Sequence, residues 1–235
     1  MPDPQRQAIV EELLPEATRQ LIRTADALDD EEYAAPSGLP GWSRGHVLAH
    51  LALNAEGLAG ALRGILEGTR TTMYASPEAR DGDIEELAAA GPTEIRTRLL
   101  DATTDLADTL DALPDDQWDT TFDRTPGGRT NAAGDVPRMR LQEVEIHHAD
   151  LASDYSYAGW TPAFATLLLD GMQPRDETAD AFQVRASDLG RTWAFGDGGP
   201  TVTGTGAALG WWLTGRGTGE GLTSDSGALP QIGAW

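Results

Sequence analysis

Apolar residues recur at helical spacing in four stretches of the first two-thirds of the chain, and this pattern constrains the fold most. The stretches cover residues 4–28, 43–68, 81–113 and 135–153. Ser43 is the expected N-cap of the second stretch. Gly91-Pro92 is expected to interrupt the third, and Pro137 falls in the first turn of the fourth. Four such helices predict an antiparallel bundle in which one or two connections are long.

After residue 155 the pattern changes to short apolar runs separated by Gly and Asp turns. We expect helices over 162–172 and 206–214, and strands over 182–185, 192–195 and 201–203. The first helix is expected to end in the acidic stretch 29–32. The polar segment 115–134 is expected to be a loop, and the tail 215–235 to be mostly loop. The predicted fold class is therefore α + (α+β), with a helical bundle over 1–154 and a smaller α+β domain over 155–235.

Composition excludes several kinds of chemistry. The formal net charge of -21 opposes binding to nucleic acid. All 17 basic residues are Arg, which excludes Schiff-base chemistry and a phosphate-loop lysine. The chain has no Cys, so any sulfur nucleophile must come from outside. It has no apolar run of about 18 residues and no signal-peptide layout, so we expect a cytoplasmic monomer without a membrane partner.

The four histidines of the chain fall in two close pairs. His46 and His50 lie on the second predicted helix, and His147 and His148 lie on the fourth. A lone histidine more often has a structural role than a ligand role. Two pairs on two helices of one bundle instead favour a shared site.

Helical geometry selects among these residues. At about 100° per residue, Glu143 and His147 lie near the centre of the apolar face of the fourth helix. Glu145 points nearly the opposite way, and His148 lies toward the flank. On the second helix, His50 is closer to the apolar face than the histidine one turn earlier. A carboxylate on an apolar face needs a cation, so Glu143 and His147 either form a hydrogen-bonded pair or bind a metal.

Three ligands of this kind indicate a catalytic metal site. Two His and one Glu leave the fourth tetrahedral position open. A di-metal site would need further carboxylates and E-x-x-H spacing, whereas the spacing here is E-x-x-x-H. We predict one divalent ion held by His50, Glu143 and His147. Zinc is favoured, and iron, nickel and manganese stay open.

Four segments, spread over nearly the whole chain, carry a family resemblance. They are Gly41-Trp42-Ser43-Arg44-Gly45-His46-Val47-Leu48-Ala49-His50, Met73-Tyr74-Ala75-Ser76-Pro77-Glu78-Ala79-Arg80, Glu143-Val144-Glu145-Ile146-His147-His148-Ala149-Asp150-Leu151, and Thr214-Gly215-Arg216-Gly217 with Leu229-Pro230 and Trp235. With them the chain resembles the mycothiol-dependent maleylpyruvate isomerases of the DinB-like superfamily. The first segment is common to much of that superfamily, whereas the second and fourth are specific to the isomerases.

The resemblance implies a DinB-like four-helix bundle and a C-terminal α+β domain that completes the substrate site in a cleft between them. His50, Glu143 and His147 match the family's metal ligands, and Arg80 and Arg216 match its substrate-site arginines. The implied activity is isomerisation of maleylpyruvate to fumarylpyruvate in gentisate degradation. A metal-bound mycothiol thiolate would add to the double bond, allow rotation and leave. The two arginines would bind the carboxylates of this dicarboxylate substrate.

Three residues have open roles at this point. His46 either orients substrate or serves packing. Asp150 either holds a ligand histidine from outside the coordination sphere or is exposed. His148 stands where relatives have a small residue, and it is not included among the ligands.

Three alternative functions also stay open. A mycothiol S-transferase or conjugating enzyme would use the same metal-bound thiolate on another electrophile. A metal-binding sensor module would have a closed coordination sphere and no turnover. A purely structural role would involve no metal.

Overall fold

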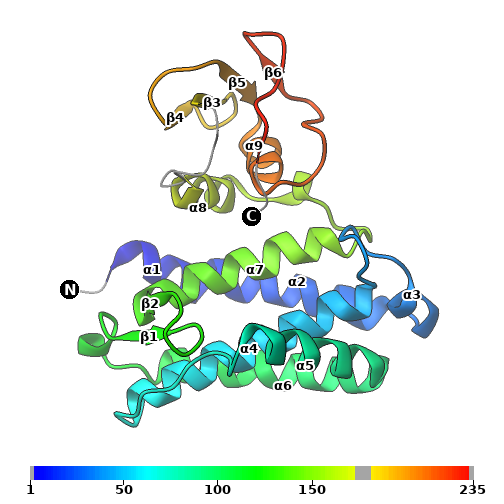
Figure 1. Cartoon of the computed structure of the whole chain (residues 1–235), viewed down its shortest axis with the longest axis vertical. Coiled ribbons are helices and arrows are strands. Elements are labelled where there is room, and N and C mark those ends of the chain that lie inside the picture. Colours follow the sequence, from blue (N-terminus) through cyan, green and yellow to red (C-terminus); the bar gives the residue numbers. More distant parts are fainter. Residues whose placement is uncertain (1–2, 173–180, 233–235) are drawn as a thin grey trace. The chain divides into compact units, whose positions relative to one another are not determined.

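The computed structural model describes residues 3–172 and 181–232, and it is mostly helical with a small sheet (Figure 1). The predicted fold class is confirmed. The chain divides into two compact units, Met1–Asp154 and Tyr155–Trp235. Trp235, part of the fourth resemblance segment, lies outside the described residues. Within those residues, no helix has both the length and the apolar character needed to cross a membrane.

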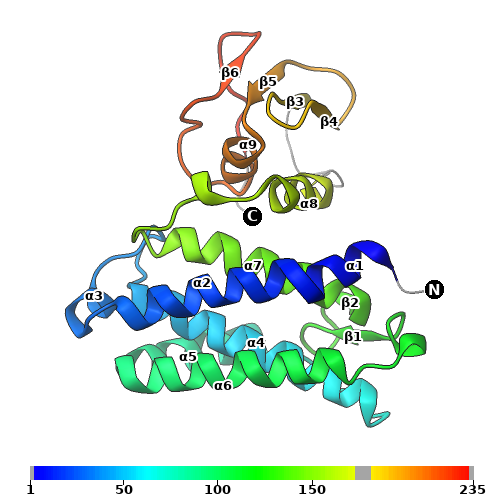
Figure 2. The same cartoon turned by 180° about the vertical axis from the view of Figure 1, so that it is seen from behind.

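The first unit is a helical bundle (Figures 1 and 2). Its main elements are α1 (Pro4–Ala8), the π-helical turn η1 (Ile9–Leu13), α2 (Leu14–Ala27), α4 (Arg44–Leu66), α5 (Pro77–Ala89), α6 (Pro92–Asp111) and α7 (Val136–Asp150). The first three are continuous and correspond to the first predicted helix. Helix α4 packs against α5, α6 and α7, and α2 packs against α7. Sixteen of the 23 residues of α4 are buried, so α4 is the central helix of the bundle.

Capping and helix-breaking residues set the ends of these helices. Ser43 caps α4, accepting a hydrogen bond from the backbone of the third helical residue at 3.3 Å. Gly91, with a φ of 94°, separates α5 from α6, which begins at Pro92. The N-cap and the break are confirmed. Helix α5 begins four residues earlier than expected, because Ser76 caps it and Pro77 occupies its first turn.

Several short elements lie between the predicted helices and strands. They are α3 (Asp30–Ala34), the 3-10 turns η2 (Asp115–Gln117), η3 (Ala133–Asp135) and η4 (Tyr157–Gly159), the antiparallel pair β1 (Thr121–Asp123) and β2 (Thr130–Ala132), and β6 (Thr223–Ser224). The expectation of a loop at 115–134 was therefore wrong in part, whereas the described part of 215–235 is mostly loop as expected. Asp29 and Glu32 form a capping box that starts α3. The strands are only two or three residues long, too short to show an alternating pattern.

The second unit combines two helices with a four-stranded sheet of order β4-β3-β5-β6. Its further elements are α8 (Pro162–Met172), β3 (Phe182–Ala186), β4 (Arg191–Phe195), β5 (Thr201–Gly204) and α9 (Gly206–Leu213). Strand β3 pairs antiparallel with β4 and parallel with β5. Gly199, with a φ of 82°, lies between β4 and β5, where a Cβ would overlap the backbone of Ala181. The rings of Phe182 and Phe195 stack at 4.8 Å in the core of this unit. The predicted helices and strands of this unit are confirmed.

Candidate metal centre

The beginning of α4 and the end of α7 are tied together by hydrogen bonds to backbone carbonyls. The N–H of Gly38 donates to the carbonyl of Asp150 at 2.7 Å. Arg44 donates from Nε to the carbonyl of Leu151 at 2.8 Å and from Nη2 to that of Ala152 at 2.9 Å. These donors satisfy carbonyls at the C-terminus of α7 that the helix itself leaves free. The last turns of α7 are thereby held against the first turns of α4.

Three donor atoms converge between α4 and α7 at the metal centre, defined as His50, Glu143 and His147. Glu143 Oε2 lies 2.9 Å from His50 Nε2 and 3.2 Å from His147 Nε2, and all the donor atoms lie within 4.8 Å of one another. Donors around a tetrahedral zinc ion lie about 3.3 Å apart, so these separations suit a metal ion. Across residues 3–172 and 181–232, no other group of three or more acidic or histidine side chains has such an arrangement.

The metal centre is accessible on its carboxylate side. The side chain of Glu143 is 25% exposed, whereas those of His50 and His147 are 5% and 9% exposed. The two imidazole rings meet edge-on, with centroids 4.7 Å apart. Three protein donors with one solvent-accessible side leave space for an exogenous ligand, as in catalytic zinc sites.

Asp150 orients one of the imidazoles. Its Oδ2 accepts a hydrogen bond from His147 Nδ1 at 2.8 Å, and the Asp150 side chain is 1% exposed. With its Nδ1 proton held by Asp150, His147 can offer the lone pair of Nε2 to a metal ion. Metal-binding histidines commonly have such a carboxylate partner. Of the two roles left open for Asp150, the structure favours the outer partner of a ligand histidine.

Burial and hydrogen bonding oppose each other at the metal centre. Burial would raise the pKa of Glu143, but hydrogen bonds from His147 and His50 outweigh it and hold this pKa well below its usual range. Burial lowers the pKa of His50 despite the adjacent carboxylate. Burial also acts to lower the pKa of His147, but Asp150 and Glu143 more than compensate and raise it. The centre thus holds an ionised carboxylate that needs a cation, either a proton on His147 or a metal ion.

Arg80 reaches the metal centre from the first turn of α5. Its Nη2 donates to His50 Nδ1 at 3.2 Å and its Nη1 to Asp81 at 2.7 Å, while its buried Nε has no hydrogen-bond partner. The Arg80 guanidinium lies 5.8 Å from the centroid of the Tyr74 ring, and that of Arg124 lies 5.9 Å from the same ring. The Arg80 guanidinium next to the metal centre favours an anionic ligand, in a chain that is otherwise strongly acidic.

Gly57 allows the loop that leads to Arg80 to approach α4 closely. It lies two turns after His50 on the same face of the helix. A Cβ at this position would lie 3.0 Å from the carbonyl oxygen of Met73 and 3.4 Å from Cε1 of Tyr74. Burial raises the pKa of the Tyr74 phenol, which therefore stays protonated at neutral pH. The close approach brings the second resemblance segment to the metal centre.

Comparison with known proteins assigns a family to this arrangement. The family described as "Mycothiol maleylpyruvate isomerase N-terminal domain" matches residues 14–152, more than half of the chain. The chain belongs to the mycothiol maleylpyruvate isomerase family. The predicted family membership is thus confirmed. The match includes all three residues of the metal centre. No curated protein matches the chain.

Two solved structures of this isomerase family resemble the whole chain. One is a crystal structure of the mycothiol-dependent maleylpyruvate isomerase, with 26% sequence identity and a TM-score of 0.87. The other is a variant of that isomerase with one histidine changed to alanine, with 25% identity and a TM-score of 0.87. Each comparison covers 100% of this chain and 98% of the other. The similarity therefore includes both units of the chain.

His46, whose role was left open between orienting substrate and packing, takes part in helix capping. Its Nδ1 lies 2.7 Å from Oγ of Ser43, within the capping box of α4. Its Nε2 lies 3.2 Å from Oε2 of Glu85 on α5, and its ring stacks on Trp42. Because both ring nitrogens already have partners, the structure favours the packing role over the substrate role.

Arg216, the second predicted substrate arginine, belongs to the second unit. Its Nη1 donates to the carbonyl of Thr214 at 3.1 Å, and its guanidinium lies 5.7 Å from the ring of Trp211. Trp211 in turn stacks on Tyr157 at 5.3 Å. Hydrogen bonding and stacking hold the guanidinium in place, and its contact with substrate stays a prediction.

Arg140 adjoins the metal centre but was not predicted to matter. It is 1% exposed, and burial lowers its pKa to about 10. A signal for its burial was present in the sequence. Arg140 lies one turn from both Val136 and Val144, on the stripe that was predicted to face the core.

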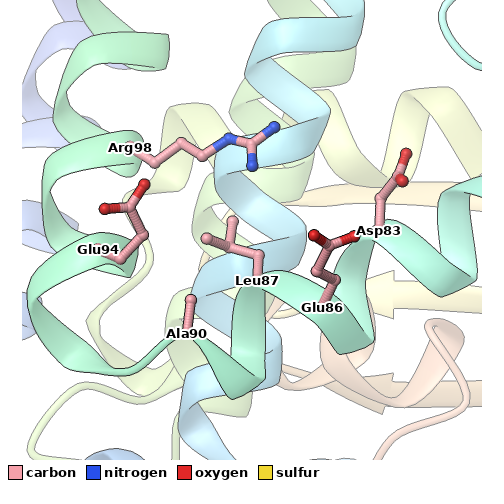
Figure 3. A pocket seen from close by; sticks show the side chains of 6 residues that line it. All are labelled: Asp83, Glu86, Leu87, Ala90, Glu94 and Arg98. Atoms are coloured by element: carbon pink, nitrogen blue, oxygen red, sulfur yellow. The ribbon is translucent and has the colours of Figure 1, made fainter.

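A surface hollow of about 560 Å³ lies along α5 and α6 (Figure 3), and none of the residues that line it belongs to the metal centre. This acidic hollow is lined by Asp83, Glu86, Leu87, Ala90, Glu94 and Arg98. Its three carboxylates are exposed, and none of its lining residues is a histidine. Arg98 already forms a bidentate pair with Glu56 at 2.6 and 2.9 Å. The acidic hollow offers no directed set of metal donors.

Proposed function

We propose that this chain is a mycothiol-dependent maleylpyruvate isomerase with one divalent metal ion, zinc in the first instance, held by His50, Glu143 and His147. The convergence of these three donors, with Asp150 behind one of them, carries the proposal. The similar solved structures name mycothiol as the thiol, and a chain without Cys needs a nucleophile from outside.

The reaction needs only a reversible nucleophile. A metal ion held by these residues would lower the pKa of a thiol in its open position. Addition of the sulfur to the cis double bond would move the π electrons into the conjugated carbonyl and leave a carbon–carbon single bond that can rotate. Departure of the sulfur restores the double bond as trans, with no net change in atoms or charge. The tasks of the chain are then to hold the metal donors, to keep one coordination position accessible and to bind the substrate.

Arginines are proposed to bind the two carboxylates of the substrate. Arg80 can exchange its bond to His50 Nδ1 for a carboxylate, because its Nε has no partner and its other contact is the exposed Asp81. Guanidinium groups bind carboxylates with two parallel hydrogen bonds. Arg216 is proposed for the second carboxylate on the strength of the family resemblance.

The decisive assay follows the isomerisation of maleylpyruvate by purified protein with and without mycothiol. Chelator-treated protein and the same protein after zinc addition are measured in parallel. We expect turnover only when both thiol and metal are present. Absence of thiol-dependent isomerisation by metal-loaded protein would overturn the proposal.

A conjugating enzyme is the second candidate, because the family match covers the unit that contains the metal centre and not the unit that contains Arg216. Such an enzyme would consume mycothiol in proportion to product, whereas an isomerase regenerates it. Measuring free thiol during the reaction distinguishes the two. A sensor module would show neither turnover nor a change in metal coordination when thiol is added.

A further inference from the structure

Arg140 is a buried cation that joins the two helices of the metal centre. On α7 it precedes Glu143 by three residues, which is about one turn. Its Nη1 donates to the backbone carbonyl of Leu51 and to Oδ1 of Asn54, both at 2.8 Å. Leu51 directly follows His50 on α4, and Asn54 lies one turn after it. One side chain thus connects the helix that supplies His50 to the helix that supplies Glu143.

The stability of the fold does not by itself account for this arrangement. Removing a guanidinium from water is unfavourable, which is why burial lowers the pKa of Arg140 to about 10. The side chain still remains cationic at neutral pH. Its buried Nη2 has no hydrogen-bond partner, and no ion pair of Arg140 is present in the described part of the chain. An apolar side chain of similar length would avoid both penalties.

We infer that Arg140 is a positioning residue for the metal centre, which keeps α4 and α7 in the register where the donors of His50 and Glu143 converge. This inference rests on the proposed metal site. A metal site requires its donors to be placed within about 0.5 Å, which calls for support from surrounding residues. Hydrogen bonds from a charged donor are stronger and more directional than neutral ones. Arg140 makes two such hydrogen bonds within one turn of His50 and of Glu143, and these bonds supply the support that the donors need.

Replacement of Arg140 should change zinc affinity in opposite directions, depending on whether Arg140 positions the ligands or acts only through its charge. The Arg140→Met substitution removes the charge and both hydrogen bonds while it keeps an apolar stem of similar reach. If only the charge mattered, zinc would bind more tightly, because a nearby cation repels a dication. If Arg140 positions the ligands, zinc must bind more weakly.

The test measures zinc affinity by competition with a chromophoric chelator. We expect affinity to fall about 10- to 100-fold in Arg140→Met, the range typical for the loss of an outer support of a metal ligand. Arg140→Lys keeps the charge and should restore part of the loss. Arg98→Met, which removes a cation from the acidic hollow, is the matched control and should leave zinc affinity unchanged. The visible spectrum of the cobalt-substituted protein should also change in Arg140→Met, which a loss of stability alone would not cause.

Equal or tighter zinc binding by folded Arg140→Met would overturn the inference. If that variant does not fold, Asn54→Ala decides, since it removes one acceptor and leaves the charge in place. Weaker binding by Asn54→Ala supports positioning, and unchanged binding overturns it. Failure of the proposed function looks different: the wild-type protein would then bind no zinc that depends on His50, whatever residue stands at position 140.

Discussion

The metal centre and the acidic hollow both contain carboxylate side chains of the same helical bundle, but these carboxylates differ in burial and in their hydrogen-bond partners. In the metal centre, Glu143 is three-quarters buried between two imidazoles, and Asp150 supports one of them. In the acidic hollow, the carboxylates of Asp83, Glu86 and Glu94 are exposed and remain hydrated. A buried carboxylate needs a directed cation, whereas a hydrated one does not. Burial together with oriented donors, rather than acidic density or cavity size, therefore marks the candidate site.

The comparison predicts its largest effect for matched substitutions in the two places. Glu143→Gln should lower zinc affinity more than about 100-fold, since even the loss of an outer partner costs 10–100-fold. Isomerisation should fall in parallel. Glu86→Gln in the acidic hollow should change neither quantity. Elemental analysis measures the bound zinc, and the rate of maleylpyruvate turnover measures isomerisation. Zinc that stays in Glu143→Gln and is lost from Glu86→Gln would place the site in the acidic hollow instead.

Arg80 tests whether the positive side chain next to the metal centre binds substrate. Arg80→Met should lower kcat/KM for maleylpyruvate about 100-fold, because it removes charge-assisted hydrogen bonds to a carboxylate. Zinc content should stay the same. Arg98→Met, which removes an arginine from the acidic hollow, should have no effect on kcat/KM. Steady-state kinetics with zinc-loaded protein decide this, and an unchanged kcat/KM in Arg80→Met would remove Arg80 from the substrate site.

Asp150 tests the support behind a ligand histidine. Asp150→Asn keeps the shape of the side chain but weakens its bond to His147 Nδ1, so zinc affinity should fall about 10-fold or somewhat more. Chelator competition measures the change. Asp83→Asn makes the same change in the acidic hollow and should leave zinc affinity at the wild-type value. Equal affinities in all three proteins would show that Asp150 does not support the metal centre.

His148 adjoins the metal centre but is not one of its donors, and it predicts a pH effect on stability. Burial lowers the pKa of His148 to about 4, and its Nε2 lies 2.8 Å from Oγ1 of Thr24. The unfolded chain takes up this proton near pH 6.5, whereas the folded chain does so only near pH 4. The contribution of neutral His148 to the free energy of unfolding is therefore complete above pH 6.5, and it is lost as the pH falls from 6.5 to about 4.

In metal-free protein, protonation of His148 lowers the free energy of unfolding at pH 5 by about 1–2 kcal/mol. The difference in free energy of unfolding between pH 7.5 and pH 5, measured with urea, should be smaller in His148→Gln than in wild type by that amount. An identical pH dependence in the two proteins would contradict the neutral, buried state of His148.

The bundle and the three donors were predictable because their signals are long or paired. Long helices repeat their apolar pattern over many turns, and Glu143 stood on an apolar face where a carboxylate has a reason to bind a cation. The role of Asp150 stayed open in the sequence, because its i,i+3 spacing to His147 fits both a hydrogen bond to that histidine and an exposed position on the helix. Arg140 was missed because burial of a cation depends on acceptors from α4, which are far away in sequence.

Other differences come from local hydrogen bonds that no periodicity reveals. His46 is a capping residue because it occupies the third position of the helix that Ser43 caps. Helix α3 depends on the reciprocal bonds of Asp29 and Glu32 rather than on an apolar stripe. Such single contacts stabilise short elements, and a hydrophobic pattern does not report them.

The central claim is that the metal centre holds an ion whose open position accepts the thiol. The most direct measurement is the absorption spectrum of the cobalt-substituted protein during titration with mycothiol. We expect a sulfur-to-cobalt charge-transfer band that grows to saturation in the wild type and is absent from Glu143→Gln. A cobalt spectrum that depends on Glu143 but does not respond to mycothiol would contradict the central claim, because the coordination sphere would then be closed to the thiol.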